Sequence, residues 1–239
     1  MNKHFLKTVA AFMLDTFFPK FCFGCHHEGT YICQDCENTM GIVEYSFCLC
    51  KKPKLLLAPG TCSSCAAKNL DGLSAALPYN NTLTKTLIHY LKYEPFVTEL
   101  SEPLASFIIN HLQLIEKKKE DFAGFVVLPI PLAQKRMRWR GFNQSQEIAK
   151  YLAEFLEIPA LNDVLVKTRE TKTQIELSET EREQNVKGVF AVKNQQVILG
   201  KRILLIDDVY TTGSTMEEAA KTLKVAGAKE VWGMAVARG

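Results

Sequence analysis

The sequence predicts an α/β fold, with a parallel sheet flanked by helices and a small cysteine-rich module near the N-terminus. Three observations support this prediction. From Phe125 onward, apolar strand-like segments alternate with amphipathic ones; residues 203–215, ILLIDDVYTTGST, join an apolar strand to acids and hydroxyls; and all eight cysteines lie between Cys22 and Cys65. With 239 residues, 47% of them hydrophobic, and a net charge of +3, the chain can form one core and a small module. Any affinity for phosphate or nucleic acid must therefore come from local clusters of charge.

The first 19 residues are expected to form an amphipathic helix that packs on the body of the protein. Leu6, Met13 and Phe17 recur at helical spacing. Asp15 interrupts the apolar run and no small-residue cleavage site follows, which favours this helix over a signal peptide. No segment approaches the roughly 18 to 20 apolar residues of a membrane-spanning helix. We therefore expect no membrane span and a cytoplasmic protein.

The cysteines are spaced like metal ligands. They form four close pairs, Cys22/Cys25, Cys33/Cys36, Cys48/Cys50 and Cys62/Cys65. A close pair of cysteines sits on a tight turn, and two such pairs supply the four sulfurs of a tetrahedral Zn²⁺ site. Eight cysteines therefore predict two structural zinc ions. Disulfides and a redox dithiol are the alternatives; the lack of an export signal disfavours the first, and the clustering of four pairs disfavours the second.

Short loops favour sequential pairing, in which the first two pairs share one zinc and the last two share the other. The spacing of Cys48 and Cys50 is one residue short of the usual knuckle, which weakens the prediction for the second site. We expect residues 20–66 to form a double zinc ribbon that depends on metal for folding, because so short a segment has too few large apolar side chains for its own core.

A polar stretch after Cys65 marks the boundary of a larger domain over residues 72–239. Apolar runs and helical periodicity predict its elements in order. Strands are expected at residues 73–79, 125–131, 163–168, 201–208 and 230–238, and helices at residues 82–93, 95–115, 143–159 and 214–227. Asn143 is a candidate cap for one helix. Ser214 and Glu217 have the spacing of a capping box for the last one.

The end of the strand at residues 201–208 is the candidate site. Ligands of parallel sheets bind at the carboxyl ends of the strands, where Asp207 and Asp208 are expected. The next turn offers backbone N–H groups and hydroxyls at a helix N-terminus, which suits a phosphate group. This turn consists of Thr211, Thr212, Gly213, Ser214 and Thr215. Because carboxylates accept hydrogen bonds from vicinal hydroxyls and support Mg²⁺, the combination predicts a sugar-phosphate site.

Residues 203–215 resemble the phosphoribosyl-pyrophosphate (PRPP) signature of type I phosphoribosyltransferases. Together with LPIPLAQKRMRWRGFNQSQEIAKYLA, KTRETKTQIELSETEREQNVKGVFAV and the paired cysteines, the chain from about Phe17 to Arg238 resembles the ComF family. The resemblance implies a type I phosphoribosyltransferase fold behind a double zinc ribbon. It further implies that Asp207 and Asp208 contact the ribose hydroxyls, that residues 211–215 bind the 5'-phosphate, and that residues 129–131 and the basic loop after them bind pyrophosphate.

That basic loop has support of its own in the sequence. Lys135, Arg136, Arg138 and Arg140 place four cations within six positions with no acid among them. A solvated surface turn is the alternative reading. Trp139 either stacks on nucleic-acid bases or packs locally. The polar segment from Lys167 to Gly188 resembles an insert of the family and is a candidate lid over PRPP.

Three functions follow from these motifs. The leading hypothesis is a PRPP-using phosphoribosyltransferase in DNA uptake or nucleotide metabolism, with Mg²⁺ on the leaving pyrophosphate and an acceptor that the sequence does not identify. The alternatives are a non-enzymatic protein that binds single-stranded DNA and works with other DNA-uptake proteins, and a PRPP sensor; the oligomeric state stays open. We do not expect amidophosphoribosyltransferase activity, because it needs a glutaminase half with an N-terminal cysteine nucleophile, whereas this sequence starts with Met1 and Asn2 and its cysteines are predicted to bind zinc.

Overall fold

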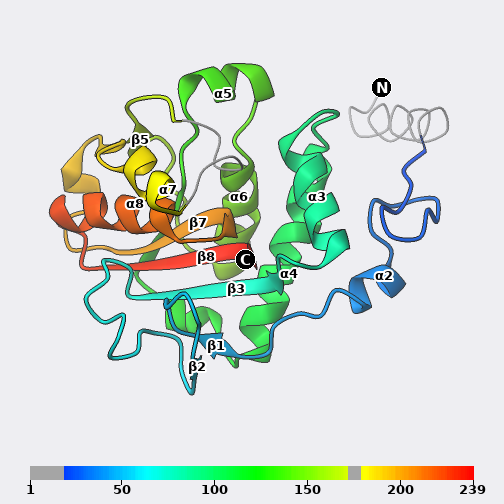
Figure 1. The fold of residues 1–239 in the computed structure, drawn as a ribbon, viewed down its shortest axis with the longest axis horizontal. Coiled ribbons are helices and arrows are strands. Elements are labelled where there is room, and N and C mark those ends of the chain that lie inside the picture. Colours follow the sequence, from blue (N-terminus) through cyan, green and yellow to red (C-terminus); the bar gives the residue numbers. More distant parts are fainter. Residues whose placement is uncertain (1–18, 172–178) are drawn as a thin grey trace, which may run out of the picture.

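The computed structural model describes residues 19–171 and 179–239, and its centre is a parallel sheet of four strands (Figure 1). In spatial order the strands are β3 (Gly72–Pro78), β8 (Glu230–Arg238), β7 (Arg202–Tyr210) and β4 (Phe125–Pro129). All three pairings are parallel. Every strand therefore ends at the same edge of the sheet, and β7 occupies a central position there, between β4 and β8.

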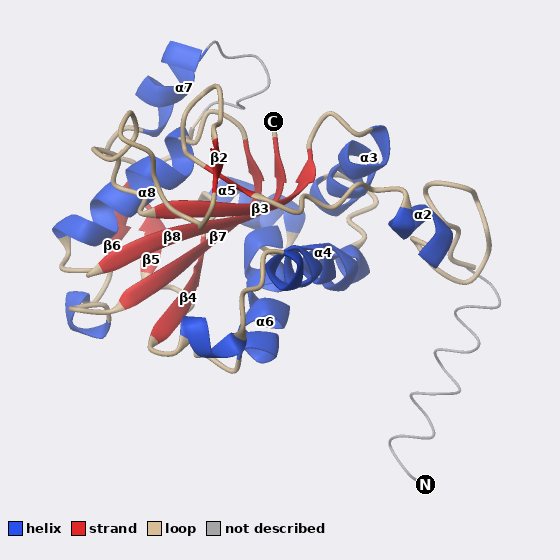
Figure 2. Cartoon of the chain, turned by 90° about the horizontal axis from the view of Figure 1, so that it is seen from below, coloured by secondary structure: helices blue, strands red, loops and turns tan. Residues whose placement is uncertain are grey.

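Helices cover both faces of this sheet (Figures 1 and 2). The described α-helices are α2 (Gln34–Asn38), α3 (Thr82–Lys92), α4 (Ser101–Leu114), α5 (Gln134–Arg140), α6 (Gln144–Leu156), α7 (Glu179–Val186) and α8 (Ser214–Val225). Short 3-10 turns lie at Thr98–Leu100, Lys119–Phe122 and Gln195–Val197. The Asn143 side chain accepts a hydrogen bond from the Ser145 amide at 3.1 Å, which confirms it as the cap of α6.

The apolar run of β7 is buried on both sides, as expected for an inner strand of a parallel sheet. Leu204 and Ile206 pack with α3, α4 and α6 on one face. Ile203 and Leu205 pack with α8 on the other. Because side chains alternate along a strand, one continuous apolar segment contributes to two hydrophobic cores. The parallel order of the main sheet confirms the predicted α/β class.

Two sequence-based expectations about strands need correction. The segment predicted at residues 163–168 does form a strand, β5 (Leu165–Lys167), but it pairs with β6 (Phe190–Val192) in a separate antiparallel sheet. Local apolar pattern predicts a strand but not its partner, so the pattern alone could not show this. In addition, β7 continues through Tyr210, so both acids lie inside the strand rather than at its end as predicted.

The cysteine-rich segment divides between the two faces of the sheet. Ile32 and Met40, from its first half, belong to the core on the side of α3 and α4. Leu49, from its second half, belongs to the core on the side of α8. A small antiparallel pair, β1 (Ser46–Phe47) and β2 (Leu55–Leu56), lies in the second half. The helix expected within residues 1–19 lies almost wholly outside the described residues. Among the helices that are described, none is long and apolar enough to cross a membrane.

Candidate functional site

A cleft of about 820 Å³ opens at the carboxyl edge of the sheet. Its floor is the end of β7 and the turn that follows, which includes Asp207, Asp208 and all of residues 211–215. Its walls come from α3 on one side and from the loop after β4, α5, the start of α6 and the end of β5 on the other. The topology therefore gathers into one cavity residues that are far apart in the sequence.

The two adjacent acids of β7 have different surroundings. Asp208 is buried, and its Oδ1 lies 2.8 Å from Nζ of Lys92, the last residue of α3. Its Oδ2 has no hydrogen-bond partner among the described residues, although it too is buried. Asp207 is half-buried, and its Oδ1 accepts hydrogen bonds from Ser145 Oγ at 3.0 Å and from the Asp208 amide at 2.9 Å.

These surroundings raise the proton affinities of both Asp207 and Lys92. Burial, and then repulsion by Asp208, raise the pKa of Asp207 to about 7. For Lys92, burial by itself would lower the pKa, but the attraction of Asp208 outweighs it and the pKa is raised. The cleft therefore contains one carboxylate held by a cation, Asp208, and one carboxyl group, Asp207, that takes up or loses a proton near neutral pH.

The turn at residues 211–215, which we call the phosphate loop, depends on one glycine. Gly213 has a φ of +79°, and a Cβ at this position would lie 2.3 Å from Tyr210 Oη. Only glycine fits this backbone conformation at so close an approach. The hydroxyls of Thr212 and Ser214 lie 2.8 Å apart beside it, at the N-terminus of α8. Hydroxyls and a helix N-terminus in one turn form a geometry that can hold a phosphate group.

The predicted capping box of α8 is wrong. Gly213 is the N-cap residue, Ser214 is the first residue of the helix, and no side chain caps it. The Glu217 carboxylate instead accepts hydrogen bonds from the amide and side chain of Asn69, at 2.6 and 2.7 Å, and from the Leu70 amide at 3.3 Å. A tertiary contact with the segment after the cysteines replaces the local bond that the spacing suggested.

The predicted basic loop is a helix, α5, and its four cations divide between two sides. Arg136 and Arg140 are four residues apart, share one side of the helix and line the cleft. Lys135 and Arg138 are exposed on the other side. Arg140 is buried, donates to Gln144 Oε1, and has its Nε without a partner among the described residues. The sequence spacing identified the group of four cations. It could not show that Arg136 and Arg140 face the cleft, because that follows from the helical conformation of α5.

The sequence did not single out two cations of the cleft, Lys92 and Lys167. Lys92 follows an ordinary amphipathic pattern, and only the packing of α3 brings it to Asp208. Lys167 ends β5, and its Nζ donates to Thr171 Oγ1 at 2.8 Å. Burial, and then the nearby charge of Arg136, lower the pKa of Lys167 to about 8. No local signal in the sequence could have assigned either lysine to the site, because both reach it through tertiary packing.

The segment considered as a lid is described only in part. Residues 172–178 of this segment lie outside the described residues. Arg182, on α7, lines the cleft, and the Gly188 amide after α7 donates to Glu218 Oε1 on α8 at 2.7 Å. This insert is thus attached to the body of the protein next to the candidate site.

The eight cysteines form two groups of four, with the sequential pairing that the sequence predicted. The first cysteine cluster is Cys22, Cys25, Cys33 and Cys36, and the second cysteine cluster is Cys48, Cys50, Cys62 and Cys65; within each, the sulfurs lie within 4.8 Å of one another. Backbone amides donate to these sulfurs, as from Lys54 to Cys48 Sγ at 3.1 Å. A hydrogen bond from the Cys50 side chain is the largest influence lowering the pKa of Cys62 to about 6. Each set of four thiols can hold a metal ion, the second despite its short Cys48–Cys50 spacing.

Comparison with known proteins adds to this geometry. A family model described as "Phosphoribosyl transferase domain" matches residues 140–238. Competence protein ComFC of Streptococcus pneumoniae is 30% identical over 211 residues, which are 86% of this chain and 86% of that protein.

Two further relatives match over shorter lengths. Competence protein F of Haemophilus influenzae is 39% identical over 112 residues, 46% of this chain and 49% of that protein. DNA utilization protein YhgH of Escherichia coli is 31% identical over 150 residues, 61% of this chain and 64% of that protein. The matched region thus spans about half of the first of these relatives and less than two thirds of the second.

Proposed function

The chain belongs to the ComFC family of competence proteins, and from that premise we propose that it binds PRPP in the cleft at the carboxyl edge of the sheet and acts in DNA uptake. One observation carries the ligand proposal. Asp208 Oδ2 and Arg140 Nε are both buried in the cleft without partners among the described residues. Buried polar atoms are almost always hydrogen-bonded, so a ligand with both hydroxyl donors and anionic acceptors would complete this site. A sugar carrying phosphates has this chemistry.

Each part of PRPP has a complementary group in the cleft. The phosphate loop receives the 5'-phosphate, and Asp207 and Asp208 accept hydrogen bonds from the ribose hydroxyls. Arg136, Arg140 and Lys167 line the opposite wall, where they face the pyrophosphate. Lys92 pairs with Asp208 and would hold its carboxylate in place beside the ribose. Mg²⁺ would enter with the pyrophosphate and neutralise part of its charge, and the carboxylates of Asp207 and Asp208, which line the cleft, could bind it.

We propose further that the protein is a phosphoribosyltransferase. The cations of α5 and β5 would stabilise the negative charge that accumulates on pyrophosphate as its bond to ribose C1 breaks. The acids and the phosphate loop would hold the ribose in place for attack by an acceptor. Both cysteine clusters would hold zinc as structural ions.

Isothermal titration calorimetry with PRPP and Mg²⁺ tests the shared binding site. The parent protein should bind, and Asp207→Asn/Asp208→Asn should weaken binding by about a hundredfold, because two hydrogen bonds to charged acceptors are lost. Asp121→Asn is the control, since this carboxylate lies in an exposed turn before β4, at the opposite edge of the sheet from the cleft, and should leave binding unchanged. A parent protein that does not bind PRPP would end the proposal.

Pyrophosphate release separates a transferase from a sensor that only binds PRPP. The parent protein with PRPP, Mg²⁺ and candidate acceptors, single-stranded DNA included, should release pyrophosphate faster than the same mixture containing Arg136→Ala/Arg140→Ala. Tight PRPP binding without release, for every acceptor tried, would favour the sensor.

A second candidate function, binding of single-stranded DNA, is favoured by the surface of α5. The Trp139 side chain is 51% exposed, although its ring contacts Phe96, with centroids 5.0 Å apart. It is flanked by the exposed cation of Arg138. An exposed aromatic ring beside a cation suits base stacking. Labelled single-stranded DNA should bind the parent more tightly than Trp139→Ala at low salt and lose affinity as salt rises; equal binding by both proteins would remove α5 from the interface.

A further inference from the structure

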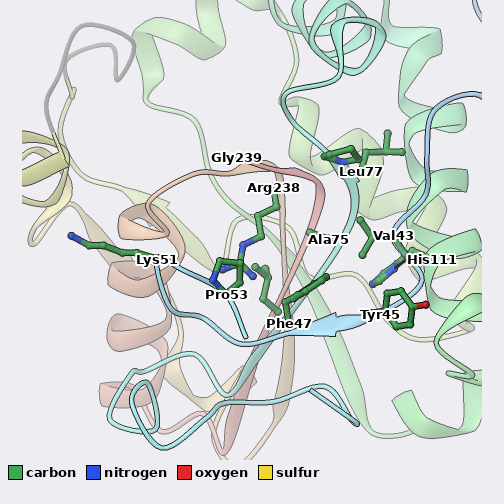
Figure 3. Close-up of a pocket in the computed structure, with 12 residues that line it drawn as sticks. Val43, Tyr45, Phe47, Lys51, Pro53, Ala75, Leu77, His111, Arg238 and Gly239 are labelled. Carbon is green, nitrogen blue, oxygen red and sulfur yellow. Dashed lines mark hydrogen bonds between the residues drawn. The ribbon is translucent and has the colours of Figure 1, made fainter. Parts of the chain in front are cut away.

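The second cysteine cluster lies against the strand ends that carry the phosphate loop. Arg238, the last residue of β8, donates from Nη1 to the Cys48 carbonyl at 2.9 Å and from Nη2 to the Cys50 carbonyl at 3.0 Å. Figure 3 shows its side chain reaching from the end of β8 toward Pro53 and Phe47, which belong to the same module. One guanidinium thus connects the main sheet to the backbone of two predicted metal ligands.

The same guanidinium also contacts the residue that supports the phosphate loop. It lies over the ring of Tyr210, with Cζ 5.4 Å from the ring centroid. Tyr210 ends β7 immediately before the loop, and its hydroxyl occupies the space that a side chain at position 213 would need. The Tyr210 carbonyl accepts a hydrogen bond from the Gly239 amide at 2.9 Å, which fixes the two strand ends together. A displacement of the Arg238 side chain would therefore alter its contact with Tyr210 and, through Tyr210, the position of the phosphate loop.

A second connection reaches the other end of the loop. Glu217, in the first turn of α8, accepts three hydrogen bonds from Asn69 and Leu70, which follow Cys65 closely in the chain. Two of these bonds come from backbone amides, so they fix the path of the chain as it leaves the second cysteine cluster. The phosphate loop is thereby held on both sides by the same module.

The first cysteine cluster contacts a different wall of the cleft. Phe23, between Cys22 and Cys25, stacks on Tyr90 of α3 with ring centroids 4.2 Å apart. Its contacts are thus on the Lys92 side of the site, away from β8 and α8. The first cluster contacts α3, whereas the second contacts the structure around the phosphate loop. Variants of the first cluster can therefore serve as controls for variants of the second.

We propose that the second cysteine cluster, when it holds its metal ion, positions the phosphate loop through Arg238 and Glu217. Four thiolates around one ion fix the Cys48–Cys50 turn, so that its two carbonyls stay in the geometry that the planar guanidinium needs. Without the ion, the turn loses this constraint, and both connections to the loop loosen. Arg238 and Glu217 are positioning residues, since they act on the loop through Tyr210 and through the start of α8. The loop's role in binding phosphate rests on the proposed function, but the positioning itself does not.

Hydrogen exchange of the full-length protein, measured by mass spectrometry without any ligand, tests the positioning. Arg238→Lys keeps the charge but not the fork of two donors. Amides in the peptide covering residues 210–218 should exchange about tenfold faster in this variant, the factor expected for losing one hydrogen bond from a charged donor. Arg202→Lys is the matched control, because Arg202 also lies over an aromatic ring, that of Phe125 at 4.1 Å, but at the other end of the sheet.

Cysteine variants test the metal dependence. Cys50→Ser/Cys62→Ser should speed exchange in residues 210–218, whereas Cys25→Ser/Cys33→Ser should speed it in α3 and leave residues 210–218 as in the parent. Unchanged exchange of this peptide in both Arg238→Lys and Cys50→Ser/Cys62→Ser would overturn the proposal.

PRPP calorimetry on the same proteins links positioning to binding. Arg238→Lys and Glu217→Gln should each weaken PRPP binding several-fold, while Arg202→Lys should not. If the parent protein fails to bind PRPP, the proposed function is wrong, yet the exchange experiment still decides whether the second cluster positions the loop.

Discussion

Two neighbouring aspartates of β7 have different partners in the cleft. Asp208 points to the face covered by α3 and meets Lys92. Asp207 meets Ser145 at the start of α6 and has no cation within ion-pairing distance among the described residues. Sequence reasoning located both acids at the ligand end of the sheet, but not Lys92, because the contact between α3 and β7 has no local signature. What distinguishes the two acids is therefore tertiary structure.

The raised pKa of Asp207 predicts that the free protein becomes less stable as pH rises. In the unfolded chain this group ionises near 3.8, whereas in the folded protein it keeps its proton up to about pH 7. Between these values the folded state binds the additional proton, so the free energy of unfolding falls with increasing pH. Urea unfolding between about pH 4 and about pH 8 should show this fall. Asp207→Asn should flatten it, and an equal slope in both proteins would contradict the prediction.

Gly213 provides a test of the phosphate loop. Gly213→Ala should reduce the free energy of unfolding by at least about 1 kcal/mol more than Gly124→Ala. Both glycines have a φ of +79°, so the cost of a left-handed backbone is the same in the two variants. Only at position 213 would the new Cβ meet Tyr210, while nothing lies within 4 Å at position 124. Equal destabilisation, measured by urea unfolding, would show that the contact with Tyr210 does not constrain the loop.

At the scale of elements, the strands and flanking helices of the main sheet followed from the apolar pattern, but α5, α7 and β6 did not, and neither did pairings and ends. The run at residues 201–208 gave a central parallel strand because it is buried on both faces. The equally strand-like run at residues 163–168 pairs outside the main sheet with β6, and a pattern that reports burial says nothing about the partner. Glu217 shows the same limit for helix ends, since its tertiary bonds to Asn69 and Leu70 replace a local cap.

Helix α5 makes a prediction that depends on its two sides. Arg136→Ala/Arg140→Ala should weaken PRPP binding by about a hundredfold, because two cations that line the cleft are removed. Lys135→Ala/Arg138→Ala removes the same net charge from the exposed side and should change binding less than about threefold at physiological salt. Calorimetry on both double variants compares them directly. Equal losses would mean that only the overall charge of α5 matters.

At the scale of the whole molecule, the cysteine-rich segment is integrated into the larger domain rather than attached to one end of it. Its first half contributes to the core beneath α3 and α4, and its second half contributes to the core beside α8. The first cluster therefore lies on the side of α3, and the second lies beside α8 and the strand end before the phosphate loop. The sequence predicted the grouping of the cysteines from loop length, but it could not predict that the two clusters lie on opposite faces of the sheet.

Native mass spectrometry should find two zinc ions on each full-length chain. Cys50→Ser/Cys62→Ser should retain one, because the first cluster keeps its four thiols. Removing both ions with a chelator should lower the thermal midpoint of the full-length protein, since metal binding contributes to folding free energy. A metal-free chain whose mass is reduced by the hydrogens lost in disulfide formation would contradict the assignment of these cysteines as zinc ligands.

The central claim is that PRPP occupies the cleft at the carboxyl edge of the sheet, and a crystal structure of the full-length protein with PRPP and Mg²⁺ tests it most directly. We predict that the 5'-phosphate lies against residues 211–215, that the ribose hydroxyls lie within hydrogen-bond distance of Asp207 and Asp208, and that the pyrophosphate lies toward Arg136 and Arg140. A cleft without PRPP, in crystals soaked at a concentration that saturates the protein in solution, or PRPP bound elsewhere, would contradict the claim.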